Sequence, residues 1–220
     1  MKNSNCPHDH LDCPLPADLE RLQAERETLR NLVSVDELTG FFNFRFLKSA
    51  LEGEMERTRR TGLPTGLIMV DLDDFKQVND TYGHENGNLA LQAATRIWKA
   101  QIRKIDIPCR YGGEEFVIIL PNTRIHDAIR AAERLRKELA AAPLVLDTDS
   151  IQLTASFGVD AYQAGEDLAV EAFIHRVDMF VLDAKSEGRN RVCYDRRKVV
   201  RPATEVTPEE RDSLFTKRKL

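Results

Sequence analysis

A Gly-Gly turn that leads directly into an apolar run constrains the fold of this chain more than any other feature. Residues 110–116 read Arg-Tyr-Gly-Gly-Glu-Glu-Phe, and Val-Ile-Ile-Leu follows at 117–120. Two glycines between polar residues and an apolar run predict a tight hairpin turn that enters a buried strand. Glu114 and Glu115 follow glycines that let a ligand approach the backbone closely. Such carboxylates can hold a hard divalent cation, which can in turn hold a triphosphate; an ordinary solvated turn is the alternative.

Composition narrows the class of protein. The chain has 220 residues, 42% hydrophobic and 31% charged, which suits one domain of about 150 to 180 residues with flanking segments. The net charge of −4 gives no reason to expect nucleic-acid binding. No apolar run approaches the roughly 20 residues of a membrane span and the N-terminus does not resemble a signal peptide, so we expect a cytoplasmic protein. The four cysteines are too scattered for a disulfide scaffold.

The N-terminal segment, residues 1–16, combines side chains that bind transition metals. Two cysteines and two histidines lie within eight residues of one another: Cys6, His8, His10 and Cys13. Their types suit zinc or another transition metal, although the spacing matches no standard structural zinc site. A disordered terminus and a redox-active cysteine pair are the alternatives.

Residues 17–34 are predicted to form a helix that joins two copies of the chain. Apolar residues repeat at steps of four and three, interrupted at Arg26, and they are Leu15, Leu19, Leu22, Leu29 and Val33. This heptad-like pattern predicts a short parallel coiled coil, and therefore a homodimer. An amphipathic helix packed on its own domain is the alternative.

Helices and strands alternate through residues 35–195. The patterns predict helices at residues 43–60, 88–103, 125–142 and 170–186, and a helical turn at 75–80 that ends at 81–84. They predict strands at residues 66–70, 117–120, 151–159 and 192–194. This order predicts an α+β sandwich in which helices surround a mostly antiparallel central sheet. Residues 196–220 are charged and sparsely apolar, so we expect a disordered tail.

The short motifs of this domain resemble the GGDEF family of diguanylate cyclases. The matching stretches are residues 36–40 (DELTG), 71–80 (DLDDFKQVND), 82–84 (YGH), 110–116 (RYGGEEF), 156–158 (SFG) and 184–190 (AKSEGRN). They lie in order and at the family's spacing across residues 35–195, and the signature has the GGEEF form that active members also use. The resemblance implies a polymerase-palm-like, nucleotidyl-cyclase catalytic domain over those residues, preceded here by the N-terminal helix.

The resemblance also implies an activity. Each protomer would bind one GTP, and two facing protomers would make cyclic di-GMP and pyrophosphate. Mg²⁺ (or Mn²⁺) would be held by Asp71, the main-chain carbonyl of Leu72, and Glu114, while Glu115 would take the 3'-hydroxyl proton or share the metal. The other predicted catalytic residues are Lys76, Lys185 and Arg189. The predicted substrate contacts are Asp74, Phe75, Asn79, Asn88 and Gly113.

Arg103 and Asp106 match the RxxD site through which the product inhibits members of the family. An arginine can bind guanine and phosphate in bidentate fashion, whereas an ordinary ion pair at a helix end is the alternative. A non-catalytic receptor for cyclic di-GMP would need only this site. The presence of the predicted catalytic residues argues against such a receptor.

One departure from the family concerns the base. The glycine after the Gly-His motif is usually followed by Asp, which reads guanine together with the preceding Asn; this chain has Gly87-Asn88, with Asn79 intact. An amide has one acceptor and one donor group, so one guanine donor would face another donor, whereas adenine meets no such conflict. A cyclase of relaxed specificity that makes hybrid cyclic GMP-AMP or cyclic di-AMP is therefore an alternative to a strict GTP enzyme.

Overall fold

A central sheet of five strands organises the protein, for which a computed structural model describes residues 19, 21–22, 34–145 and 150–199. The strand order is β2-β3-β1-β6-β7. The strands are β1 (Thr65–Leu72), β2 (Ile107–Arg110), β3 (Glu115–Leu120), β6 (Ala155–Tyr162) and β7 (Val192–Cys193). All neighbouring strands pair antiparallel except β6 and β7, which are parallel. A separate hairpin consists of β4 (Pro143–Val145) and β5 (Ser150–Gln152).

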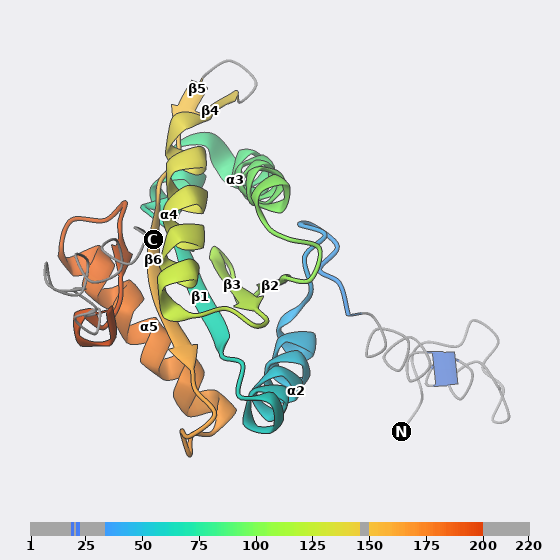
Figure 1. The fold of residues 1–220 in the computed structure, drawn as a ribbon. Coiled ribbons are helices and arrows are strands. Elements are labelled where there is room, and N and C mark those ends of the chain that lie inside the picture. Colours follow the sequence, from blue (N-terminus) through green and yellow to red (C-terminus); the bar gives the residue numbers. More distant parts are fainter. Residues whose placement is uncertain (1–18, 20, 23–33, 146–149, 200–220) are drawn as a thin grey trace, which may run out of the picture.

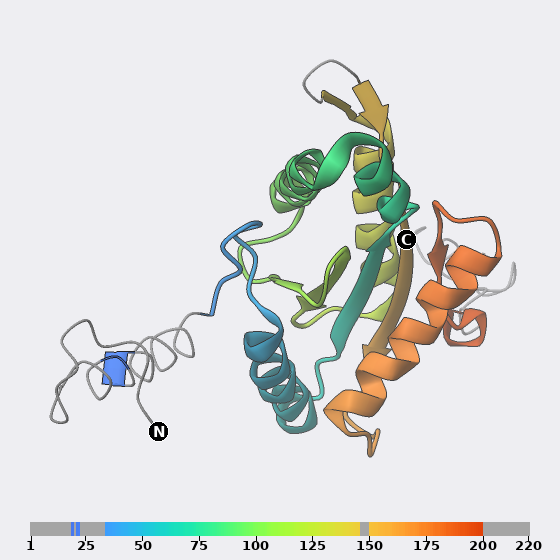
Figure 2. The same cartoon turned by 180° about the vertical axis from the view of Figure 1, so that it is seen from behind.

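Helices cover both faces of the central sheet (Figure 1). They are α2 (Phe44–Thr61), α3 (Phe75–Gln101), α4 (Ile125–Ala141) and α5 (Val170–Ser186), followed by the short 3-10 helix η1 (Arg196–Val199). One core joins the sheet to α3 and α4 through residues such as Trp98 and Leu135. A second core joins the opposite face to α2 and α5 through Leu51 and Val177. Figure 2 shows the same layers from behind, and the predicted α+β sandwich is confirmed.

Strand β1 lies at the centre because its sequence is apolar on both faces. Every one of its residues is buried. Leu67 and Met69 enter the core beside α2 and α5, whereas Ile68 and Val70 enter the core beside α3 and α4. A strand covered by helices on both sides needs such a continuous apolar run. The strand therefore holds Asp71, near its C-terminal end, on a rigid support.

The structure corrects several predicted elements. The predicted break at 81–84 is confirmed at Gly83 (φ 84°, ψ 161°), whose non-helical backbone separates two helical stretches within α3, but the second stretch begins before residue 88. The strand predicted at 151–159 is divided between β5 and β6, and β6 extends to Tyr162. The sequence did not indicate β2, because Pro108 interrupts the pattern. That proline is tolerated because β2 is an edge strand.

The predictions for the two termini fall mainly outside the described residues. Cys6, His8, His10 and Cys13 lie outside them, and within the predicted helix at 17–34 only residues 19, 21, 22 and 34 are described, of which the first three are helical. The tail prediction is wrong for residues 196–199, which form η1 because Lys198 pairs with the buried Asp160 at 2.8 Å. Residues 200–220 lie outside the described part. None of the described helices has the length and apolar content that crossing a membrane requires.

Candidate active site

The carboxylates predicted to bind a metal lie together at one end of β1 and β3. Asp71 of β1 is directly opposite Glu115 of β3 in the antiparallel register. The N–H of Leu72 donates to the carbonyl of Glu114 at 3.3 Å, which extends the pairing past the end of β3. The hairpin between β2 and β3 therefore brings Glu114 and Glu115 beside Asp71, although more than 40 residues separate them in the chain.

The electrostatics of this cluster favour a bound cation. Burial raises the pKa of Asp71, and the charge of Glu114 adds to the rise, while the hydrogen bond from Lys185 opposes it. Burial likewise raises the pKa of Glu115, together with the negative charges of Asp71, Asp178 and Glu114. Carboxylates that hinder one another's ionisation are stabilised by a cation among them.

The predicted metal ligands suit Mg²⁺, which needs few protein ligands, better than they suit a metal that is bound by protein side chains alone. Within residues 34–145 and 150–199, no three His, Cys, Asp or Glu side chains gather in a ready-made metal site. The predicted donors are the carboxylates of Asp71 and Glu114 and the main-chain carbonyl of Leu72. Mg²⁺ is commonly held by one or two carboxylates together with substrate phosphates and water. These residues therefore suit a Mg²⁺ ion that is shared with a nucleotide.

Helix α5 carries Lys185 onto this cluster. The Nζ atom of Lys185, in the last turn of α5, lies 2.6 Å from Oδ2 of Asp71. The helix crosses β6 at Gly158, where a Cβ atom would lie 2.2 Å from the carbonyl oxygen of Val177. Glycine is required there because a side chain would collide with the helix backbone. Gly158 thus sets the distance between α5 and the sheet, and with it the reach of Lys185.

The Gly-Gly turn is fastened by Arg110. Its Nη2 atom donates to the carbonyl of Gly113 at 2.8 Å, and its Nε atom lies 3.1 Å from the carbonyls of both Gly112 and Gly113. Its Nη1 atom pairs with Oδ1 of Asp36 at 3.2 Å. The predicted substrate contact Gly113 is itself exposed at the tip of the turn. Arg110 therefore ties the tip that precedes Glu114 to the N-terminal end of the domain.

Buried Asp73 holds the loop that follows α5, a role that the sequence did not reveal. It accepts hydrogen bonds from the hydroxyls of Thr154 and Ser156, both at 2.7 Å, and from the N–H of Asn190 at 3.0 Å. Arg189 and Asn190 have φ values of 59° and 47°. Residues with side chains rarely adopt this left-handed conformation, so the loop depends on such bonds. Asp73 therefore fixes the backbone from which Arg189 projects.

The start of α3 offers backbone donors to an anion. The N–H groups of Phe75 and Lys76 lie in its first turn, where no helix supplies a carbonyl partner, and helix N-termini favour phosphate. Phe75 is only 6% exposed and its side chain packs into the core, so this predicted contact could reach a ligand only through its backbone N–H. Lys76 is exposed. Arg189 lies close by, because its Nε atom is 3.3 Å from Oδ1 of Asp74.

The two predicted base-reading residues lie on either side of the bend in α3. Asn79 precedes the bend at Gly83, and Gly87 and Asn88 follow it. A Cβ atom on Gly87 would lie 1.9 Å from Oδ1 of Asn79, so the Asn79 amide occupies the space that a side chain would fill. Asn79 is half-buried and Asn88 is exposed. The Asn79 amide therefore lies against Gly87, the residue that precedes Asn88.

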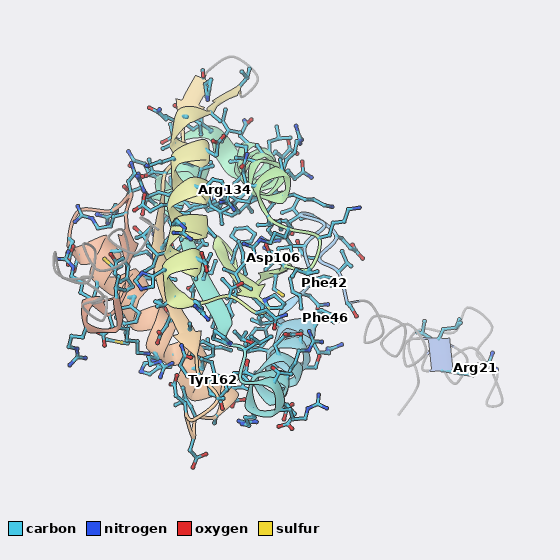
Figure 3. All side chains as sticks on the ribbon, in the orientation of Figure 1. Arg21, Phe42, Phe46, Asp106, Arg134 and Tyr162 are labelled. Atoms are coloured by element: carbon cyan, nitrogen blue, oxygen red, sulfur yellow. The ribbon has the colours of Figure 1, made fainter. Side chains whose placement is uncertain are left out.

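Arg103 and Asp106 form a turn between α3 and β2. The N–H of Arg103 donates to Oδ2 of Asp106 at 2.7 Å, while Oδ1 of Asp106 has no hydrogen-bond partner among the described residues. Burial raises the pKa of Asp106, and the charges of Arg103 and Arg134 oppose the rise. Both residues of the turn border a hollow of about 350 Å³ that Phe42 also lines. Asp106 and Arg134 are labelled in Figure 3. The sequence did not indicate Arg134 as a residue of this site, because Arg134 belongs to α4 and comes near Asp106 only in the folded protein.

Comparisons with known proteins identify the family of this chain. The family model described as "Diguanylate cyclase, GGDEF domain" matches residues 33–191. The response regulator PleD of Caulobacter vibrioides is 40% identical over 163 residues, which are 73% of this chain but 36% of PleD, so the chain spans about a third of that relative's length.

Two solved structures extend the likeness to the fold. The diguanylate cyclase SiaD of Pseudomonas aeruginosa, crystallised with its activator SiaC, is 36% identical with a TM-score of 0.70, over 81% of this chain and 68% of that one. The coiled coil and GGDEF domain of DgcB from Caulobacter crescentus, in complex with c-di-GMP, is 26% identical with a TM-score of 0.70, over 81% of this chain and 94% of that one. The chain therefore belongs to the GGDEF family, the diguanylate cyclases.

Proposed function

We propose that this chain is an Mg²⁺-dependent diguanylate cyclase, which condenses two GTP molecules into cyclic di-GMP and two pyrophosphates. The observation that carries the proposal is the cluster in which Lys185 pairs with Asp71 beside Glu114 and Glu115. The complex of the related DgcB with c-di-GMP supports the same chemistry. Because GTP is a cytoplasmic nucleotide, we expect the reaction to take place in the cytoplasm.

Different residues have different roles in the in-line displacement at the α-phosphorus. Lys185 and Arg189, with the first N–H groups of α3, bind and orient the triphosphate. Glu115 takes the proton of the attacking 3'-hydroxyl, because its position opposite Asp71 places its carboxylate at the same end of the sheet as the predicted metal ligands. Asp71 and Glu114, with the carbonyl of Leu72, would hold Mg²⁺, which supplies neutralisation of charge on the leaving pyrophosphate.

A second copy of the chain completes the reaction. Each protomer presents one nucleotide, so the 3'-hydroxyl of one GTP must attack the α-phosphate of the GTP in the facing protomer. We assign residues 17–34 to the homodimer contact, because a coiled coil raises the effective concentration of the two half-sites. Deleting residues 1–34 should then lower the activity per protomer on dilution, whereas an unchanged specific activity would rule out a dimerising helix. Metal analysis of the intact protein tests Cys6, His8, His10 and Cys13.

Product inhibition at Arg103 and Asp106 forms part of the proposal. The unpartnered Oδ1 atom of Asp106 and the nearby charge of Arg134 supply one acceptor and one cation for a guanine or a phosphate. Cyclic di-GMP bound there would act at a distance from the carboxylate cluster, since the turn lies at the far end of β2.

The test is to incubate the purified protein with Mg²⁺ and GTP, ATP or both, and to identify the products by mass. Cyclic di-GMP from GTP is expected. Asp71→Asn and Glu114→Gln should abolish it and weaken Mg²⁺ binding measured by calorimetry in the presence of nucleotide. Asp127→Asn is the matched control, because it removes a half-buried carboxylate that pairs with Arg130 in the first turn of α4, beyond the opposite end of β3. Binding of cyclic di-GMP without any synthesis would make the protein a receptor.

A second product is kept open by one specific observation. Asn79 and Asn88 both lie at the bend of α3, where the family places a carboxylate at the second position. A site lined by two amides accommodates the adenine edge as well as the guanine edge. A hybrid cyclic GMP-AMP in the mixed incubation would establish this activity.

A further inference from the structure

Arg189 sits on a backbone that the protein holds in place, while its side chain is held by one ion pair. The N–H of Arg189 donates to the carbonyl of Ala184 at 2.9 Å, and the next N–H, of Asn190, donates to Asp73 at 3.0 Å. Arg136 binds the side-chain oxygen of Asn190 at 2.9 Å. The guanidinium itself pairs with Oδ1 of Asp74 at 3.3 Å. Arg189 can therefore exchange Asp74 for another anion by rotating its side chain, without any movement of its backbone.

Asp74 occupies an unusual position for a carboxylate. It is the N-cap residue of α3, with φ 52°, yet its side chain makes no capping hydrogen bond to the helix. An Asp at this position normally accepts from an N–H of the first turn. Here the carboxylate pairs with Arg189 instead, which leaves that first turn open to another anion. The Asp74 and Arg189 side chains are 59% and 48% exposed, so a ligand can reach both.

We propose that Asp74 competes with the substrate's phosphates for Arg189 and thereby limits the affinity of the site for nucleotide. The inference rests on the proposed function, which places the triphosphate between the first turn of α3 and Arg189. An exposed ion pair contributes little stability, so a polyphosphate of higher charge displaces the carboxylate from the guanidinium. Asp74 thus acts as a positioning residue for Arg189.

The neutral variant Asp74→Asn separates charge from backbone conformation. Asn tolerates a left-handed conformation as well as Asp does, and Asp74→Gly provides a second variant without strain at positive φ. Both should bind nucleotide more tightly than the parent. We expect a gain of about two- to fivefold, the scale of an exposed ion pair that no longer competes for Arg189.

The experiment measures equilibrium binding of 3'-deoxy-GTP by calorimetry, with Mg²⁺ present and the full chain. This nucleotide lacks the attacking hydroxyl, so binding is observed without turnover. Asp127→Asn makes the same change of net charge at the opposite end of the sheet and should leave the affinity unchanged. GMP, with fewer charges for Arg189 to bind, should show a smaller gain from Asp74→Asn than the triphosphate.

The same change in an Arg189→Gln protein gives the decisive comparison. Competition predicts that Asp74→Asn improves binding in the parent and has little effect once Arg189 is gone. An equal gain in both backgrounds would show plain repulsion and overturn the proposal, as would unchanged affinity in both Asp74 variants. Failure of the parent protein itself to bind 3'-deoxy-GTP would instead overturn the proposed function.

Discussion

The Oδ1 atom of Asn79 lies 1.9 Å from the point that a Cβ atom of Gly87 would occupy. The obstacle is the end of a side chain rather than a backbone atom, so a methyl group at Gly87 would displace the amide and leave the helix in place. Gly87 follows the bend in α3 and has no left-handed φ. The absence of a side chain at Gly87 thus allows the orientation that Asn79, a predicted base-reading residue, adopts.

Gly87→Ala should therefore lose nucleotide binding without losing stability. Ala is favoured over Gly by about 1 kcal/mol inside a helix, which offsets the cost of moving Asn79. Loss of one buried hydrogen bond to the base should weaken binding of 3'-deoxy-GTP about five- to hundredfold. Gly53→Ala in α2, where the added methyl meets open space, is the control for helix propensity. A thermal midpoint that falls in Gly87→Ala alone would show that the residue serves packing instead.

Replacing Asn88 by Asp should sharpen the choice of base. A carboxylate accepts from both guanine donors, whereas the amide presents a donor to one of them. In an equimolar mixture of GTP and ATP, Asn88→Asp should suppress any hybrid product and lower the GTP requirement. Pure cyclic di-GMP from the parent, with no change in the variant, would mean that Asn88 turns its oxygen to guanine and that water satisfies the other donor.

Arg103→Ala and Arg134→Ala should both weaken inhibition by the product. Each removes a cation near Asp106, and a charge-assisted hydrogen bond contributes about 1.5–3 kcal/mol, which corresponds to roughly ten- to hundredfold in the inhibition constant. The constant for cyclic di-GMP is measured from initial rates at several product concentrations. Arg130→Ala, an exposed arginine on the same helix as Arg134, is the control. Equal inhibition of all the proteins would leave the turn with a purely structural role.

Asp36→Asn tests the contact that fastens the Gly-Gly turn, through its pH dependence. Burial raises the pKa of Asp36, but hydrogen bonds from Thr39 and the charge of Arg110 outweigh burial and lower the pKa below 3.8. The ionised carboxylate therefore stabilises the folded state above pH 3.8, and this contribution disappears as the pH falls through the lower folded pKa. The variant should lose about 1–2 kcal/mol at neutral pH, and the difference should shrink in acid. Urea unfolding at several pH values measures it.

Local sequence patterns were enough for the elements that carry the catalytic motifs. The apolar run of β1, the Gly-Gly turn and the amphipathic α4 and α5 follow rules that act within a few residues. The β4–β5 hairpin was missed because strands of three residues have no period to detect. The break in α3 was predicted at 81–84 and lies at Gly83, but the start of the second helical stretch was placed too late, at residue 88.

In the candidate site, too, local sequence patterns did not reveal contacts between residues that are distant in the chain. The predicted grouping of Asp71 with Glu114 and Lys185 came from the resemblance to the GGDEF family, and the fold brings those residues together. Asp73, Arg134 and Asp178 act through neighbours that are distant in the chain, so no local pattern could assign them. The requirement for glycine at Gly158 is equally invisible in sequence, because it depends on how closely α5 approaches β6.

The ion pair between Lys198 and Asp160 determines where the C-terminal boundary of this domain should lie when the domain is fused to another protein. Asp160 is 1% exposed and is neutralised by Arg176 at 2.7 Å and by Lys198 at 2.8 Å. The family match ends at residue 191, before η1. A fusion trimmed to that boundary would discard one of the two cations that neutralise a carboxylate inside the sheet, and removing a partner from a buried charge is costly. A graft that ends after Val199 keeps both.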